Sequence, residues 1–183
     1  MNFSIRYVKP DMVSASSPDL REITSIYNEA VVAGGVTADT EPRTLGQRAE
    51  WVNAHSPRED FPVVVAESES GEIAGFASLS RFHPRAGYDG IAEVSYYVAK
   101  KFHKQGLGHQ LLAWLERAAR ERGFRKLTAI IFADNHGSIA LMKSHGFTRY
   151  GLLPHASYNA VLGKYHDVAY WYKDLIGEDL ADN

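Results

Sequence analysis

The sequence predicts a single α/β (α+β) domain over residues 1–183, built around a mixed β-sheet. Three observations predict this fold. The 183 residues, 45% of them hydrophobic, are enough to bury one sizeable core and leave no clear room for a second. Apolar residues recur with a period of two in some segments and of 3.6 in others, which indicates strands and amphipathic helices. Their order, β-α-α-β-β-β-α-β-α-β-β, is typical of a mixed sheet with covering helices.

The first elements are a short strand and two helices. The sequence predicts the strand at residues 5–8. Ser17-Pro18-Asp19 then provides a helix cap, a first-turn proline and an acidic first turn, and an apolar stripe at helical spacing follows until Gly34-Gly35. Thr44 and Gln47 form a capping-box pattern, which predicts a second helix through about residue 55.

A hairpin and a partly polar strand follow. The apolar runs at 61–67 and 73–80 are joined by a Ser- and Gly-containing turn, which predicts a hairpin, and residues 81–90 read as a loop. Residues 92–99 alternate well enough for a strand. The period of two places three polar side chains on one face of that strand: Glu93, Ser95 and Tyr97. Val94, Tyr96 and Val98 fall on the other face.

The C-terminal half begins with a basic, glycine-bearing turn at residues 100–108. An amphipathic helix follows it and ends at Gly123. The remaining predicted elements are a strand at 126–132, a short helix at 138–144, and strands at 147–152 and 166–174.

Composition excludes several classes of function. Lys and Arg total 20 against 22 Asp and Glu, so a net charge of −2 provides no global attraction to nucleic acid or to an anionic membrane. The absence of cysteine excludes disulfides, thiolate metal sites and an acyl-cysteine intermediate. No apolar signal core or run of about 18 apolar residues occurs, and we therefore expect a soluble, cytoplasmic protein. The eight histidines show no metal-ligand spacing, so we expect no metal site.

Residues 103–109 have the properties of a pyrophosphate cradle, because small residues at a helix start let backbone amides approach an anion. Lys100, Lys101 and Lys104 add positive charge nearby. An ordinary strand-to-helix turn with solvated lysines explains the same spacing equally well. A dinucleotide-binding turn does not fit, because Leu111 occupies the position of its third glycine, and the Walker A pattern is absent.

Several spaced motifs then resemble a known family. Gln105-Gly106-Leu107-Gly108, Asn135 to Leu141 and Gly146-Phe147 are similar to the acetyl-CoA-binding core of GNAT acetyltransferases. Ile26-Tyr27-Asn28, Thr40-Glu41-Pro42, Arg85-Ala86-Gly87-Tyr88-Asp89 and Lys164 to Val168 resemble more narrowly the phosphinothricin and methionine sulfoximine acetyltransferase group. The resemblance implies a mostly antiparallel central sheet flanked by helices on both faces, acetyl-CoA as cosubstrate, a small-molecule amine as substrate, and a homodimer.

The resemblance also implies a set of cofactor-binding residues. The backbone of Val98, Ala99 and Lys100 is expected to pair with the pantetheine arm. The pyrophosphate is expected at His103, Lys104, Gln105, Gly106, Leu107, Gly108, His109, Gln110 and Leu111. Asn135 and Ser138 match positions further along the arm. The family usually has Gln or Arg where His103 stands, which leaves the role of this side chain open.

Amide formation requires a base, because an alkyl ammonium with a pKa of about 10 is almost wholly protonated at neutral pH. Glu93 matches the glutamate of the family at this place, and we predict that it takes this proton. A solvent-facing or arginine-paired glutamate is the structural alternative. Met142 stands where relatives carry a proton donor, so the leaving thiolate must take its proton from Tyr97, another tyrosine or solvent.

On the acceptor side, Arg85 matches a family position where a guanidinium could pair with a carboxylate, although a solvated loop arginine fits equally. The expected acceptor-binding residues are Arg85, Ala86, Gly87, Tyr88, Ser95, Tyr96 and Ala38. The family has a bulky aromatic residue where Ala38 lies, and residues 157–163 form a stretch about two residues longer than in the family. We therefore predict direct acetyl transfer to an amino-acid-like amine. The alternatives are acetylation of a protein N-terminus or lysine, and a non-catalytic acyl-CoA sensor.

Overall fold

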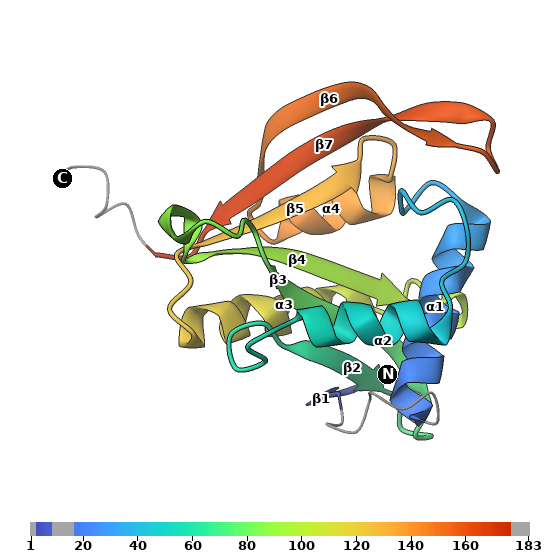
Figure 1. Ribbon diagram of the computed structural model, residues 1–183, viewed down its shortest axis with the longest axis horizontal. Helices are drawn as coiled ribbons and strands as arrows, with labels where there is room; N and C mark the ends of the chain where they lie inside the picture. The colour runs from blue at the N-terminus through green and yellow to red at the C-terminus, as the bar shows by residue number, and fades with distance from the viewer. Residues whose placement is uncertain (1–2, 9–16, 177–183) are drawn as a thin grey trace.

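The computed structural model describes residues 3–8 and 17–176, and these residues form a seven-stranded sheet with helices against it (Figure 1). The strands lie in the order β1-β2-β3-β4-β5-β7-β6. In chain order the elements are β1 (Ser4–Tyr7), α1 (Pro18–Ala33), α2 (Leu45–Ala54), β2 (Val63–Glu67), β3 (Ile73–Arg81), the 3₁₀ turn η1 (Ala86–Tyr88), β4 (Ile91–Val98), the 3₁₀ turn η2 (Lys100–Phe102), α3 (Leu107–Glu121), β5 (Lys126–Phe132), α4 (His136–Ser144), β6 (Thr148–Asn159) and β7 (Lys164–Asp174).

The central strands β4 and β5 are parallel, and every other neighbouring pair in the described sheet is antiparallel, which confirms the predicted mixed, mostly antiparallel sheet. Pairing between β4 and β5 covers only three residues of each strand, Ile91–Glu93 with Lys126–Thr128. Beyond Glu93 the two strands separate, and Figure 1 shows the gap widening toward their C-terminal ends. The second half of β4 therefore has a free edge in the middle of the sheet.

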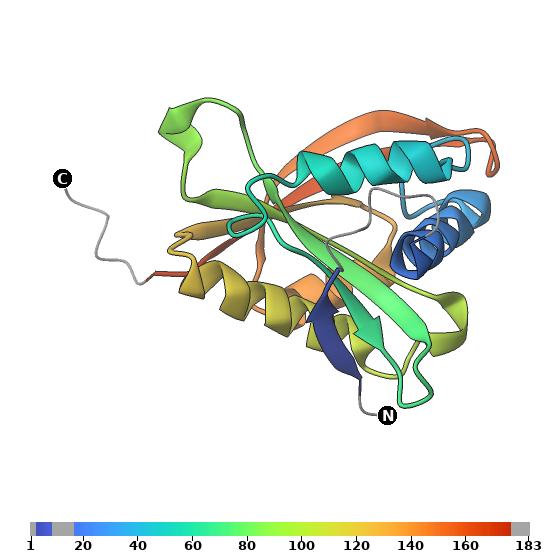
Figure 2. The same cartoon turned by 60° about the horizontal axis from the view of Figure 1, so that its bottom comes forward.

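Helices cover both faces of the sheet, as predicted (Figure 2). On one face, α1 and α2 pack through aromatic contacts: the Tyr27 ring lies 5.0 Å from Tyr97, and the Trp51 ring lies 6.0 Å from Phe76. On the other face, α3 buries its leucine stripe completely, including Leu111, Leu112 and Leu115. Because a contiguous stripe falls on one side of each helix, burial of these stripes fixes which side faces the sheet.

The C-terminal hairpin is longer than the sequence indicated. The prediction ended one strand at residue 152 and began the next at 166, whereas β6 continues to Asn159 and β7 starts at Lys164. Most side chains of β6 are exposed, so the strand carries no apolar alternation to reveal its length. The proline within it fits an edge strand with an irregular register between Leu153 and Ser157. The stretch 157–163 is thus the tip of a hairpin.

The capping box at the start of α2 offers a test of local stability. Thr44 Oγ1 accepts a hydrogen bond from the Gln47 backbone at 3.2 Å, and Gln47 Oε1 accepts one from the Thr44 backbone at 2.9 Å. We expect Thr44→Ala to lower the free energy of unfolding by about 1 kcal/mol, as measured by urea denaturation, because one amide loses its partner. Thr44→Ser keeps the hydroxyl and serves as the control. Equal losses in both variants would contradict a capping role.

Candidate active site

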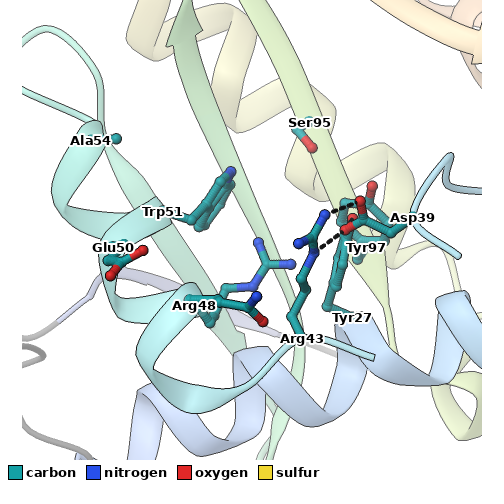
Figure 3. A pocket seen from close by; sticks show the side chains of 10 residues that line it. Tyr27, Asp39, Arg43, Arg48, Glu50, Trp51, Ala54, Ser95 and Tyr97 are labelled. Carbon is teal, nitrogen blue, oxygen red and sulfur yellow. Dashed lines mark hydrogen bonds and ion pairs between the residues drawn. The ribbon is translucent and has the colours of Figure 1, made fainter. Parts of the chain in front are cut away.

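A cavity of about 640 Å³ lies between α2, α1 and the face of β4 that the sequence predicted to be polar (Figure 3). Its walls come from four parts of the chain, and α2 supplies half of the lining residues. The lining residues are Tyr27, Asp39, Arg43, Gln47, Arg48, Glu50, Trp51, Ala54, Ser95 and Tyr97. A volume of this size suits a small molecule rather than a flat protein surface.

Glu93 lies on the same face of β4 as Ser95 and Tyr97, two residues before the first cavity residue of that strand. Its side chain is half-buried, and burial raises the pKa of its carboxyl group. Within the described chain no hydrogen bond or ion pair holds this carboxylate. A partly desolvated, unpaired carboxylate is a better proton acceptor than one in a salt bridge, which is the arrangement a general base requires.

Tyr97 is packed between two other aromatic rings. It stacks on Phe76 with ring centroids 5.2 Å apart and meets Tyr27 edge-on. Burial raises the pKa of the Tyr97 hydroxyl well above its ordinary value. Because it keeps its proton, Tyr97 can donate a proton or a hydrogen bond but cannot serve as a base at neutral pH.

The free edge of β4 presents the backbone of alternate residues. Ala99 donates its amide to Ala74 of the β3 side at 2.9 Å, so in this antiparallel pair the backbone groups of Tyr96 and Val98 point the other way, toward the gap beside β5. The Val98 carbonyl accepts a hydrogen bond from His103 Nε2 at 2.9 Å. The His103 side chain, whose role the sequence left open, thus rests on the strand edge expected to meet the pantetheine arm.

All three backbone positions expected at the pantetheine arm already have a hydrogen-bond partner within the protein, and the partner of the Val98 carbonyl is His103. The Ala99 carbonyl accepts from the Phe102 amide at 2.8 Å, in addition to the Ala99 amide bond described above. The Lys100 amide donates to the Glu29 carboxylate at 3.0 Å. At this end of β4, the backbone groups of Tyr96 and Val98 are the ones that face the gap beside β5.

The turn before α3 combines two left-handed residues with free helix amides. Lys104 and Gly106 have φ values of 60° and 80°, and Gly106 is the N-cap of α3. The first intrahelical bond runs from the Gln110 amide to the Gly106 carbonyl, so the three amides before Gln110 have no partner inside the helix. Such a helix N-terminus favours anions, which is consistent with the predicted pyrophosphate site.

Gly108 has a structural role that the sequence did not predict. A Cβ atom at this position would lie 3.1 Å from Leu141 of α4, so the missing side chain lets α3 and α4 pack closely. Leu107 and Leu111 are buried in the core, so they can offer a ligand only their backbone. Gln105 donates to the Lys101 carbonyl at 3.0 Å and stabilises the turn.

Three further residues expected at the cofactor lie close to the two ends of α4: Asn135 and Ser138 at its start, and His109 beside its C-terminal end. The Asn135 side chain caps this helix by accepting from the Ser138 amide at 3.1 Å. At the opposite end, His109 Nδ1 lies 3.1 Å from His145 Nε2, and His145 Nδ1 lies 2.9 Å from the Glu116 carboxylate. His145, the C-cap residue of α4, is therefore the centre of a hydrogen-bonded chain between α3 and α4.

The acceptor residues predicted from the sequence do not all meet at the cavity. Ser95 lines it. Tyr96 points to the opposite face of the sheet, where burial raises the pKa of its hydroxyl, which makes no hydrogen bond within the described chain although Ser138 lies beside it. Ala38 lines a small neighbouring hollow with residues of the β6–β7 tip. Arg85 to Tyr88 are exposed around η1 and are not among the lining residues.

Sequence reasoning missed most of the cavity wall, above all Arg48. This arginine is only 4% exposed and falls four residues before Val52, on the buried side of α2. A charged residue at an apolar position of an amphipathic helix is the signal that could have identified it, since arginine is rarely buried without a partner. Asp39, Arg43 and Tyr27 come from the end of α1 and the following loop, where no sequence period points to a site.

No three His, Asp or Glu side chains in residues 3–8 and 17–176 come together as a metal-binding group. None of the helices in the same residues is both long enough and apolar enough to span a bilayer.

The fold and this site define an acetyltransferase, and comparison with known proteins agrees. The model of the acetyltransferase (GNAT) family matches residues 20–147. The chain therefore belongs to the GNAT family, whose members are N-acetyltransferases that use acetyl-CoA.

Two relatives and one solved structure are similar to this chain over most of its length. A Bacillus subtilis protein provisionally named a phosphinothricin acetyltransferase is 40% identical over 76% of this chain and 85% of its own. The L-methionine sulfoximine/L-methionine sulfone acetyltransferase of Pseudomonas paraeruginosa is 34% identical over 88% of this chain and 92% of its own. The crystal structure of a Sinorhizobium meliloti phosphinothricin acetyltransferase in complex with AcCoA has a TM-score of 0.87 and 30% identity, covering 100% of this chain and 93% of that chain.

Proposed function

We propose that this protein transfers the acetyl group of acetyl-CoA directly to the primary amine of a small, amino-acid-like acceptor. The observation that carries the proposal is the cavity itself, enclosed by α2 and opening on the face of β4 that bears Glu93, Ser95 and Tyr97. The names of the relatives, which act on phosphinothricin or methionine sulfoximine, support an acceptor of this class. A concave site of about 640 Å³ is typical of small-molecule binding, which favours a small acceptor over a protein N-terminus or lysine.

The residues of the chain fit acetyl-CoA on three counts. The free amides at the start of α3 suit its diphosphate, and the edge of β4 at Tyr96 and at the Val98 amide suits its amide-containing arm, while the Val98 carbonyl is held by His103. The gap between β4 and β5 joins these two features. Acetyl-CoA supplies an activated acetyl group in thioester linkage, and with no cysteine in the chain the transfer needs no covalent enzyme intermediate.

In the proposed reaction Glu93 takes a proton from the acceptor ammonium, so that the neutral nitrogen can form the new C–N bond while the C–S bond breaks. The departing thiolate takes its proton from Tyr97 or from solvent, and the second proton that the nitrogen loses on becoming an amide replaces the one that was donated. A thiol has a pKa of about 8.5, so its anion leaves without a strong acid, and the absence of a donor at Met142 is tolerable. The predicted homodimer and the cytoplasmic location stay predictions.

The proposal is tested by a screen of acceptors with acetyl-CoA, read as thiol release. We expect turnover with phosphinothricin, methionine sulfoximine, methionine sulfone or a free amino acid, and intersecting initial-velocity lines, because both substrates must be bound together for direct transfer. Peptides with free N-termini serve as the alternative class. Turnover with peptides alone, or an acetylated enzyme detected by mass spectrometry, would contradict the proposal. Binding of acetyl-CoA without turnover of any amine would favour a sensor.

A further inference from the structure

Arg48 is a buried cation that the proposed chemistry does not yet use. Its guanidinium carbon lies 3.7 Å from the centre of the Tyr27 ring and 4.6 Å from that of Trp51. Its Nε atom is buried and has no hydrogen-bond partner. Figure 3 shows the guanidinium pointing from α2 into the space in front of β4. The two rings hold the plane of the group but supply no anion.

The charge of Asp39 acts on Arg48, but the ion pair of this carboxylate is with Arg43. Asp39 forms a two-point ion pair with Arg43, with one contact at 2.7 Å, and also accepts a hydrogen bond from the Tyr27 hydroxyl at 2.6 Å. Glu50 is exposed. Within the described chain Arg48 makes no ion pair, so one positive charge at the cavity wall lacks a counterion. Burying a charge without a counterion lowers the stability of the folded protein, and a ligand of opposite charge offsets this loss by completing the ion pair.

Burial lowers the pKa of Arg48, yet a guanidinium stays protonated at any physiological pH. Its planar fork matches the two oxygens of a carboxylate and can bind them by two parallel hydrogen bonds. Arg85, the residue suggested by sequence, is exposed and lies outside the cavity wall. The two arginines therefore differ in the property that makes a charged contact strong, which is exclusion from water.

Resting on the proposed function, we propose that Arg48 is the residue that recognises the acceptor, by binding its carboxylate at the α2 wall of the cavity. A carboxylate held at α2 leaves the amine nitrogen, two bonds from the carboxyl carbon, free to face β4, where Ser95 and Tyr97 line the opposite wall. The cavity then selects α-amino acids and their analogues over simple amines. The carboxylate completes the ion pair that the protein itself leaves open.

The test compares L-methionine sulfone with 3-(methylsulfonyl)propan-1-amine, the same molecule without its carboxylate, in wild type and in Arg48→Met. We expect wild type to prefer the carboxylate-bearing acceptor by about tenfold to a hundredfold in kcat/KM. Arg48→Met should lose this preference, and should cost the decarboxylated amine little, so that the two changes are strongly non-additive. Arg48→Lys should restore only part of it, because an ammonium cannot form the fork.

Thermal unfolding separates recognition from a structural role. Removing an unpaired buried charge while keeping its volume should leave the melting temperature of ligand-free Arg48→Met unchanged or raise it. A structural arginine would instead lower it and reduce the rates of both acceptors alike. Arg117→Met is the matched control: Arg117 is exposed on α3, with a single ion pair to Glu121 at 3.9 Å, and should change neither rate nor stability.

Two results would overturn the inference. The first is an unchanged carboxylate preference in Arg48→Met, and the second is loss of that preference in Arg85→Ala instead. In either case the proposed function stands, because wild type still acetylates the amino acid. If wild type turned over no carboxylate-bearing acceptor at all, the proposed function would fall and this inference with it.

Discussion

We expect Glu93→Gln to lower kcat about a hundredfold or more at neutral pH, which is the usual scale for the loss of a general base. The amide has nearly the same shape as the carboxylate but cannot accept the proton of an ammonium. The affinity for acetyl-CoA stays nearly unchanged, because Glu93 lies on the acceptor face of β4 and apart from the turn before α3. Steady-state kinetics and direct titration with acetyl-CoA measure the two quantities separately.

The pH profile strengthens this prediction. Burial raises the pKa of Glu93, and the residue must be ionised to act as a base, so kcat/KM of wild type should rise with pH across an acidic limb centred above the ordinary glutamate value. Glu93→Gln should lack that limb. The free energy of unfolding should change with pH in the opposite direction from the rate. Because the pKa of Glu93 is higher in the folded than in the unfolded chain, wild type should lose stability relative to the Gln variant as the pH rises from the unfolded pKa through the folded pKa.

Glu121→Gln provides the control, since Glu121 is an exposed glutamate of α3. Near-normal turnover in Glu93→Gln would show that Glu93 is structural, and a bound water or a backbone carbonyl would have to take the proton.

We expect Gly106→Asp to weaken acetyl-CoA binding about a hundredfold. Gly106 has a φ of 80° and caps α3, and a Cβ atom there would meet no atom within 4 Å. The new carboxylate would therefore stand beside the free amides, competing for them and repelling the diphosphate. The loss of about 2.7 kcal/mol corresponds to about one to two charge-assisted hydrogen bonds.

Gly106→Asn is the matched control, because asparagine and aspartate tolerate a left-handed backbone about equally and differ in charge. We expect it to keep most of the affinity, as measured by calorimetry at two salt concentrations. Equal weakening in both variants would mean that backbone conformation, and not charge, governs the site. Gly108 is unsuitable for this test, since any side chain there would strike Leu141.

The sequence by itself determined the secondary structure that carries the chemistry. Local signals sufficed for this. The capping box of Thr44 and Gln47 begins α2, as its spacing predicted. The period of two in β4 placed Glu93, Ser95 and Tyr97 on one face, and it also put Tyr96 on the other, against its assignment to the acceptor side. The glycine-bearing turn predicted at residues 100–108 leads into α3 as expected, although the helix already begins at Leu107 with Gly106 as its left-handed cap. Each of these features depends on the conformation of a few adjacent residues.

Only the tertiary structure decided what stands opposite that polar face. The charged side chains of the cavity come from segments about 50 residues before β4, namely Asp39, Arg43 and Arg48. Only the folded chain shows that Asp39 pairs with Arg43 and that Arg48 has no ion pair. The exposure of Arg85 and the separation of β4 from β5 are likewise invisible in local periodicity. A period fixes the side of an element on which a residue lies, whereas burial, and with it the strength of a charge, depends on which distant elements cover that side.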